Sequence, residues 1–368
     1  MTRIAVALSV TAVAAVVTFP QAPRAITLRS ADATLGEPFT SIHSVRELAD
    51  GRVLISDYSQ DNRVVVADMV LGRVRRVGNV GAGPREYRQA GKLFALPGDS
   101  TLLIDSPDRG RWWLLMHHDS IVRNVPPDLP ALRVVGGSPS GVDDRGHVLG
   151  VRSVGSEKLD NNRMRLQLRV VIGERSSSQA DTVARLRGDE HEVTQVGTRE
   201  RPFWVQRQLS GSVAEQALMF PDGWIAVVRV EPYRVEWRTS SGTWIRGPEV
   251  PWEWPRADAK ERAAAFERLK RRLGDRAKKD ESPWADRLAP VRSNSSMIAA
   301  PDGNLFVLRA QWSKESDTRY DVFDRSGHRI AQLALPDSER VIGFGPRSIY
   351  VSVRDNDGFH QLRRHPWP

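Results

Sequence analysis

The sequence predicts an all-β fold of the β-propeller class, built from six blades. One observation is a near repeat: the segment PDGWIAVVR, 221–229, returns as PDGNLFVLR, 301–309. Each copy joins an Asp-Gly turn to a short apolar run and a final arginine, which is the pattern of a β-hairpin. Related segments bring the number of hairpin signals to six, and they lie at 48–57, 96–105, 143–152 and 345–354.

The spacing of these segments is the second observation. Successive segments are separated by 48, 47, 77, 80 and 45 positions, measured between their last charged residues, which are Asp57, Asp105, Arg152, Arg229, Arg309 and Arg354. Three of these five intervals match the ~40–50-residue period of propeller blades, and the two longer intervals indicate insertions. Six repeats also fall within the usual range of about four to eight blades.

Each blade is expected to hold four antiparallel strands. The first repeat shows them at 41–48, 52–57, 62–68 and 72–78. The fifth repeats this plan at 295–300, 304–309, 319–324 and 328–335. The last repeat is short by one strand, so we expect residues 25–30 to complete it. Such a strand closes the ring and removes an open sheet edge.

The two long intervals contain different kinds of insertion. A polar stretch, about 188–212, separates the third repeat from the fourth. Residues 256–281, between the fourth and fifth, are rich in alanine, glutamate, lysine and arginine and are expected to form a helix. Phe266, Leu269 and Leu273 fall at helical spacing and form an apolar stripe that would pack on the propeller.

The N-terminus has the composition of a secretory signal peptide. Arg3 precedes an almost entirely apolar run, Ile4 to Phe19, and small residues follow around Ala22 and Ala25. We therefore expect a signal at 1–25 and a propeller at 26–368, exported to the periplasm or the extracellular space as a monomer. An uncleaved anchor is the alternative, and no later segment is apolar enough to span a membrane. Cysteine is absent, which excludes disulfides and thiolate chemistry.

A junction segment, GNVGAGPREY at 78–87, points to a family. Its distinctive positions are Gly81, Gly83, Pro84, Glu86 and Tyr87. With the Asp-Gly turns, it resembles bacterial exported six-bladed propellers of the NHL-repeat and TolB-like superfamily. That resemblance implies the fold. It leaves the activity open, because the superfamily includes binding scaffolds, lactonases and lyases.

The topology of a propeller predicts where a binding site lies. Loops from fourth to first strands and from second to third strands share one face. The charged residues that end second strands should form a ring there, and Arg85 and the 256–281 insertion lie on the same face. The ligand-binding residues predicted in this way are Arg152, Arg229, Arg309, Arg354, Asp57, Asp105 and Arg85. Guanidinium groups suit carboxylate or phosphate, so the expected ligand is an anionic small molecule, glycan or protein segment.

Three alternatives stay open at this point. The arginines can instead pair with acidic residues and join the blades to one another. A calcium-type ion can sit in the channel, as in propeller lactonases, with Glu215, Asn294 and Glu339 as its ligands, which would make the protein a metal-dependent hydrolase. The helical insertion can also dock the chain on an envelope complex. The net charge of +9 permits a nucleic-acid partner, but an exported protein is not expected to meet one.

Overall fold

A computed structural model describes most of the chain. The described residues are 23–105, 112–125, 139–174, 179–197, 201–273, 283–291, 297–312 and 317–367. Of the expected signal segment at 1–25, only the last residues belong to this part. No helix in it is long and apolar enough to cross a membrane.

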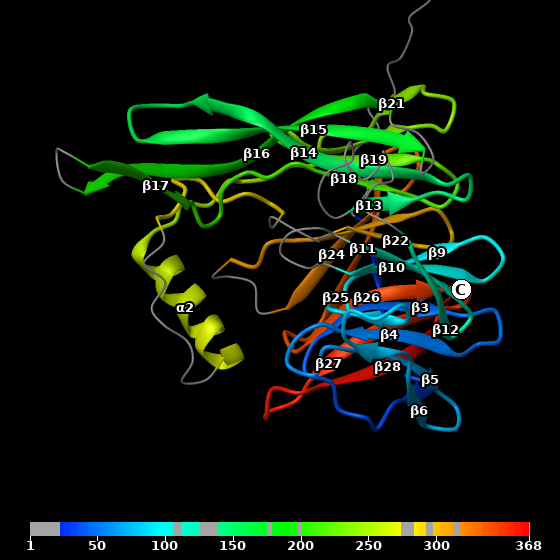
Figure 1. Ribbon diagram of the computed structural model, residues 1–368. Coiled ribbons are helices and arrows are strands. Elements are labelled where there is room, and N and C mark those ends of the chain that lie inside the picture. Colours follow the sequence, from blue (N-terminus) through cyan, green and yellow to red (C-terminus); the bar gives the residue numbers. More distant parts are fainter. Residues whose placement is uncertain are drawn as a thin grey trace, which may run out of the picture.

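Six sheets of four or five strands make up most of the described fold, and a small two-stranded sheet lies at 79–87 (Figure 1). The first sheet contains β3 (Ile42–Glu47), β4 (Val53–Asp57), β5 (Arg63–Asp68) and β6 (Arg73–Arg76). The second contains β9 (Leu93–Leu96), β10 (Ser100–Asp105), β11 (Trp112–His117) and β12 (Ser120–Val125). The third contains β13 (Pro139–Val142), β14 (His147–Lys158), β15 (Arg163–Glu174), β16 (Ala180–Gly197) and β17 (Pro202–Gln208).

The remaining sheets follow the same up-and-down order. The fourth contains β18 (Gln216–Met219), β19 (Ile225–Val230), β20 (Tyr233–Arg238) and β21 (Trp244–Arg246). The fifth contains β22 (Met297–Ala299), β23 (Leu305–Leu308), β24 (Thr318–Phe323) and β25 (Arg329–Leu335), with β1 (Arg24–Ile26) added at its edge. The sixth contains β26 (Glu339–Gly345), β27 (Ser348–Arg354), β28 (His360–Pro366) and β2 (Ala33–Thr34).

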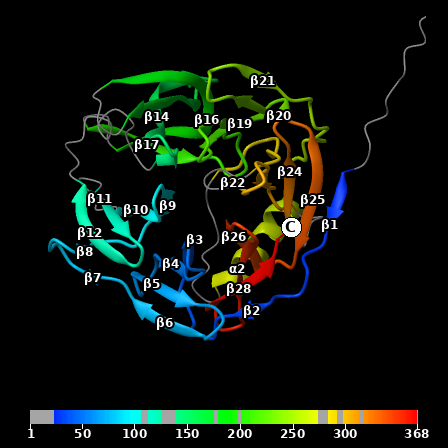
Figure 2. The ribbon, with the colours of Figure 1, turned by 90° about the vertical axis from the view of Figure 1, so that its right-hand side faces the viewer.

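The first strands of the six sheets form the inner wall of a ring. Each contacts the first strand of the next sheet, in the order β3, β9, β13, β18, β22 and β26, and β26 contacts β3 again. Figure 2 shows the sheets around this ring. The arrangement is that of a β-propeller, so the predicted fold class is confirmed. The strands expected in the first and fifth repeats are confirmed as well.

The repeated Asp-Gly pairs form the turns between first and second strands. Gly51, Gly223 and Gly303 all have positive φ, between 83° and 86°, a conformation that glycine adopts without a Cβ clash. The aspartate before each glycine accepts a hydrogen bond from the backbone N–H two residues further on, as Asp222 does from Trp224 at 3.2 Å. The near-identical sequences at 221–229 and 301–309 therefore encode the same hairpin in two sheets.

The N-terminal segment completes the ring differently from our expectation. We expected 25–30 to supply the missing strand of the sixth sheet. Instead β1 pairs in parallel with β25 of the fifth sheet, and β2 pairs with β28 of the sixth. A further bridge joins Phe39 to His360. An N-terminal strand does close the last sheet, but it lies eight residues later, because 24–26 first cover the open edge of the preceding sheet.

The polar stretch 188–212 is not an insertion between sheets, which corrects another expectation. Most of it belongs to β16 and β17, in the third sheet. In Figure 1, the long strands of this sheet extend beyond the propeller on the side where α2 (Ala259–Leu273) lies. This helix confirms the predicted helical structure in the central part of the segment 256–281. Asp258 caps it, accepting a hydrogen bond of 2.7 Å from the backbone N–H of Glu261.

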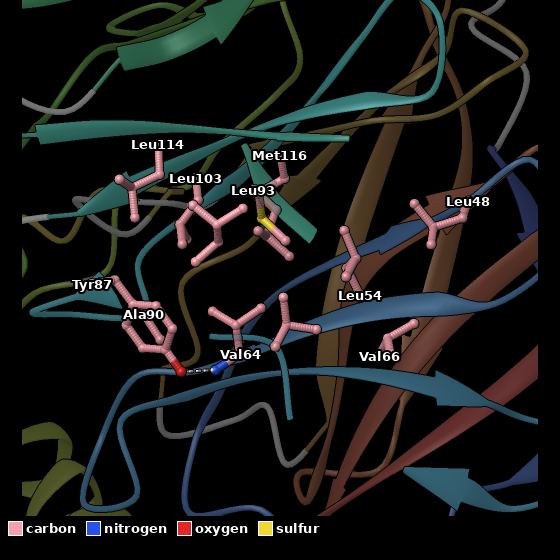
Figure 3. Close-up of a cluster of buried hydrophobic side chains, with 12 residues drawn as sticks. Leu48, Leu54, Val64, Val66, Tyr87, Ala90, Leu93, Leu103, Leu114 and Met116 are labelled. Atoms are coloured by element: carbon pink, nitrogen blue, oxygen red, sulfur yellow. Dashed lines mark hydrogen bonds between the residues drawn. The ribbon is translucent and has the colours of Figure 1, made fainter. Parts of the chain in front are cut away.

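The family-like segment at 78–87 connects the first two sheets. Tyr87 is fully buried between them, and its hydroxyl accepts a hydrogen bond of 2.8 Å from the backbone N–H of Val64 (Figure 3). The Glu86 carboxylate accepts a hydrogen bond of 2.7 Å from the N–H of Gly83. A Cβ on Gly81 would clash with the same carboxylate. These contacts give Glu86 and Tyr87 a structural role at the junction.

Candidate functional site

A cavity of about 2680 Å³ occupies the centre of the ring and its mouth, and we call it the mouth cavity. Its deeper wall comes from the first strands and is mostly apolar: Leu93, Phe94, Leu218, Met297, Ile298, Ile342 and Phe344. Its outer wall comes from the fourth-to-first and second-to-third loops, such as 40–41, 59–60 and 355–359. The mouth therefore opens on the face that the topology predicts for a ligand.

The helix α2 forms part of this wall. Four of its wall residues, Ala259, Arg262, Ala263 and Phe266, recur at helical spacing and form one stripe. Phe266 belongs to the apolar stripe expected from the sequence, whereas the side chains of Leu269 and Leu273 lie outside the described part. Arg163 of β15 holds the chain after the helix by an ion pair of 2.9 Å with Asp286. In Figure 2, α2 lies beyond the innermost strands, on the far side of the ring.

Positive charge predominates in the mouth cavity. Five basic residues line it, against three aspartates, and the basic ones are Lys92, Arg207, Arg262, Arg340 and Arg354. Within the described structure, the first four form no ion pair with an acidic residue. Two of the aspartates are engaged elsewhere: Asp337 accepts a hydrogen bond from Gln311, and Asp355 caps the turn before Phe359. The cavity thus contains cationic groups that lack an anionic partner in the described chain.

Two of the predicted site residues, Asp57 and Asp105, fasten loops at the end of their second strands. The fully buried Asp57 accepts hydrogen bonds from the N–H groups of Thr40 and Ser41, at 3.0 and 2.7 Å. Asp105 accepts hydrogen bonds from the backbone N–H groups of Arg88 and Gln89 in the equivalent loop. Burial raises the pKa of Asp105, while the N–H groups oppose that rise. Neither aspartate lines the mouth cavity.

Arg229 occupies the equivalent strand end in the fourth sheet, where the charges are reversed. Its guanidinium binds Glu215 at 3.0 Å and Glu236 at 2.8 Å. Glu215 also accepts from Arg187, at 3.2 Å. Burial opposes the charge of Arg229, but the two carboxylates raise its pKa above the usual value. This network joins the third and fourth sheets, as one of the sequence-based alternatives expected.

The other predicted residues are dispersed around the ring. Arg309 lies over the ring of Trp252, 5.0 Å from its centre, and 4.0 Å from Asp321. Arg152 is within β14, opposite Arg169, and Arg85 is exposed in the turn between β7 (Asn79–Val80) and β8 (Glu86–Tyr87). Of the seven residues predicted to bind a ligand, Arg354 alone lines the mouth cavity. A ligand role for the other six stays a prediction.

Two of the three residues suggested for a calcium site, Glu215 and Glu339, are paired with arginines. Glu215 is held by two arginines, and Glu339 forms an ion pair of 3.3 Å with Arg363. Asn294 lies outside the described residues. Among the residues described, no group of three or more acidic or histidine side chains has the arrangement of a metal site. Calcium binding and a hydrolase activity stay predictions, which titration with calcium would test.

Sequence reasoning missed most of the basic residues of the mouth cavity. It followed the ends of second strands, whereas Lys92, Arg340 and the neighbouring His43 lie where first strands begin. First strands line the channel of a propeller, so a titratable residue at the beginning of a predicted first strand could have indicated the site. Both the segment SIHS, 41–44, and the segment AGKL, 90–93, contain such a titratable residue.

These observations define the chain as a β-propeller with a cation-rich cavity at one mouth. No protein-family model matches it, and no curated protein does. Among solved structures, a DUF4221 family member from Bacteroides vulgatus is 7% identical over 92% of this chain and 97% of its own, with a TM-score of 0.49. Regucalcin from Agrobacterium tumefaciens, a calcium-binding protein, is 12% identical over 92% of this chain and 96% of its own, with a TM-score of 0.36. Virginiamycin B lyase from Staphylococcus aureus is 10% identical over 91% of this chain and 98% of its own, with a TM-score of 0.40.

Proposed function

We propose that this chain is an exported six-bladed propeller of the NHL-repeat and TolB-like kind that binds an anionic small molecule in the mouth cavity. The six sheets and the segment at 78–87 support the family assignment. The N-terminal sequence supports export. Binding, and not catalysis, is the proposed role, and the protein acts as a monomer.

One observation carries the choice of ligand. Lys92, Arg207 and Arg340 line the cavity without an acidic partner among the described residues. Lys92 and Arg340 are partly buried, and a charge that is partly removed from water is costly unless an opposite charge compensates it. An anion entering the cavity supplies that charge, and a carboxylate also matches the flat donor fork of the arginines.

Isothermal titration with citrate, benzoate and galacturonate tests the proposal. At least one of these carboxylates should bind with one site per chain, and the affinity should fall as ionic strength rises. Arg340→Met should weaken that binding about tenfold or more, since one charge-assisted contact is lost. No binding by any of them at millimolar concentration would contradict the proposal.

The matched control is Arg347→Met. Arg347 is exposed in the turn between β26 and β27, on the opposite face, and does not line the mouth cavity. This variant has the same change of net charge as Arg340→Met. It should leave the affinity for the carboxylate unchanged, and an equal loss in both variants would mean that the effect is only a general one of net charge.

A further inference from the structure

The junction between the first and second sheets contains a lysine with unusual surroundings. Lys92 lines the mouth cavity immediately before β9. Its ammonium group makes no hydrogen bond or ion pair with any described residue. Burial lowers its pKa from the usual value. Lys92 is partly buried, and a cation that is partly withdrawn from water without an anionic partner is costly for the fold, so it is retained at a binding site more readily than in a core.

The backbone around Lys92 is held firmly from both sides. The Ser56 hydroxyl lies 2.6 Å from the carbonyl oxygen of Ala90 and 2.7 Å from that of Gly91. A Cβ on Gly91 would clash with the carbonyl oxygen of Ile104, so only glycine permits this close approach. The carbonyl of Lys92 accepts a hydrogen bond of 2.9 Å from the N–H of Ile104. The base of the side chain is therefore preorganised, which lowers the entropic cost of binding.

His43 is the second polar group of this junction. It is the extra residue of a β-bulge, because its neighbours Ile42 and Ser44 pair with Asp57 and Ser56 while His43 pairs with neither. Bulges redirect side chains, and that of His43 lines the mouth cavity. Its side chain is exposed towards the cavity, but desolvation, with the nearby charge of Lys92, lowers its pKa to about 4. At neutral pH the imidazole is uncharged, so it offers a hydrogen bond without adding a second positive charge.

Below Lys92 and His43, the cavity wall changes from polar to apolar. Lys92 and His43 lie at the mouth end of the first strands, and the chain then runs inward through Leu93 and Phe94. The other first strands contribute apolar side chains to the same wall, including Leu218, Ile298 and Phe344. A ligand that satisfies both parts has one anionic end and an apolar body.

We propose that the mouth cavity binds an amphipathic monocarboxylate, with its carboxylate on Lys92 and His43 and its hydrocarbon body along the first strands. This inference rests on the proposed function and narrows the class of ligand. One ammonium group balances one negative charge, and a neutral imidazole can donate to the second carboxylate oxygen. The apolar wall buries the chain, which contributes to affinity in proportion to its length.

Isothermal titration with decanoate, octanoate, acetate and decanol tests the inference. Decanoate should bind with one site per chain, and octanoate about tenfold more weakly, because two fewer CH₂ groups are buried. Acetate should bind too weakly to measure, and decanol at least tenfold more weakly than decanoate. Lys92→Met should abolish the preference for decanoate over decanol, whereas Lys92→Arg, which keeps the charge, should retain it.

Lys260→Met is the matched control. Lys260 lies on the exposed side of α2 and does not line the cavity, so this variant should bind decanoate like the original chain. If citrate binds through Arg340 while decanoate binds no better than acetate, the inference is wrong and the proposed function stands. If no carboxylate binds, both are wrong. Preference for decanoate that survives in Lys92→Met would overturn the assignment of the carboxylate to Lys92.

Discussion

Two clusters of positive charge, both on the mouth side of the propeller, have opposite surroundings. At the junction of the third and fourth sheets, Arg229 contacts the carboxylates of Glu215 and Glu236. At the junction of the first and second sheets, Lys92 has no acidic partner in the described structure, and its charge contributes to lowering the pKa of His43, which is neutral at pH 7. The first cluster stabilises the contact between two sheets. The second leaves a charge available to a ligand, so a cation's position in the ring does not decide its role.

Removing the carboxylate at the centre of the first cluster should produce the largest effect. Glu215→Gln leaves Arg187 and Arg229 without their shared anion. The Glu215 side chain is only 4% exposed, so water cannot readily replace the lost carboxylate. We expect a loss of about 3 kcal/mol in the free energy of unfolding, because a buried ion pair is broken on one side. Urea denaturation at pH 7 measures it. A change near zero would mean that this network does not stabilise the junction.

The opposite change is expected at the second cluster. Lys92→Met removes a partly buried cation that has no acidic partner among the described residues, and methionine keeps a similar shape. The free energy of unfolding should rise by about 1 kcal/mol at pH 7, in the usual range for a stabilising substitution at a functional site. The same urea denaturation detects this. A clear loss of stability would show that the lysine has a structural role, contrary to the comparison.

The histidine of the second cluster should sharpen the comparison through its pH dependence. The folded-state pKa of His43 is about 4, below the unfolded value of 6.5. Between pH 6.5 and 4 the unfolded chain therefore binds a proton that the folded chain does not, and stability falls as the pH falls. His43→Leu should make this decline shallower. Urea midpoints at pH 6.5, 5.5 and 4.5 measure the slope, and an unchanged slope would contradict the assignment.

The smallest effect is expected where an ion pair is exposed to water. Asp286, whose side chain is 78% exposed, binds Arg163 at 2.9 Å. Asp286→Asn should cost less than about 0.5 kcal/mol, because solvent screens such pairs. Thermal denaturation alongside Glu215→Gln gives a direct comparison of exposed and buried pairs. Equal losses in the two variants would remove burial as the explanation for the difference.

The fold was more accessible to sequence analysis than the site. The Asp-Gly turns were recognisable because Gly51, Gly223 and Gly303 meet a local backbone requirement. The helix was recognisable from its composition. The strand that closes the sixth sheet was misplaced, because β1 and β2 are too short to carry a pattern and depend on the edges they meet. Most of the charged residues lie at or next to the ends of second strands as predicted, but Arg152 lies in the middle of β14, and Arg354 alone of the seven predicted residues reaches the cavity.

By itself, the sequence determined the repeating hairpins, the all-β class and the helix between the fourth and fifth repeats. These depend on contacts between residues that are near neighbours in the chain. Only the tertiary structure decided that Arg229 meets Glu215 while Lys92 meets no carboxylate of the described chain. The energy of a charge depends on its burial and on partners brought from other sheets, and the closing of the ring sets both.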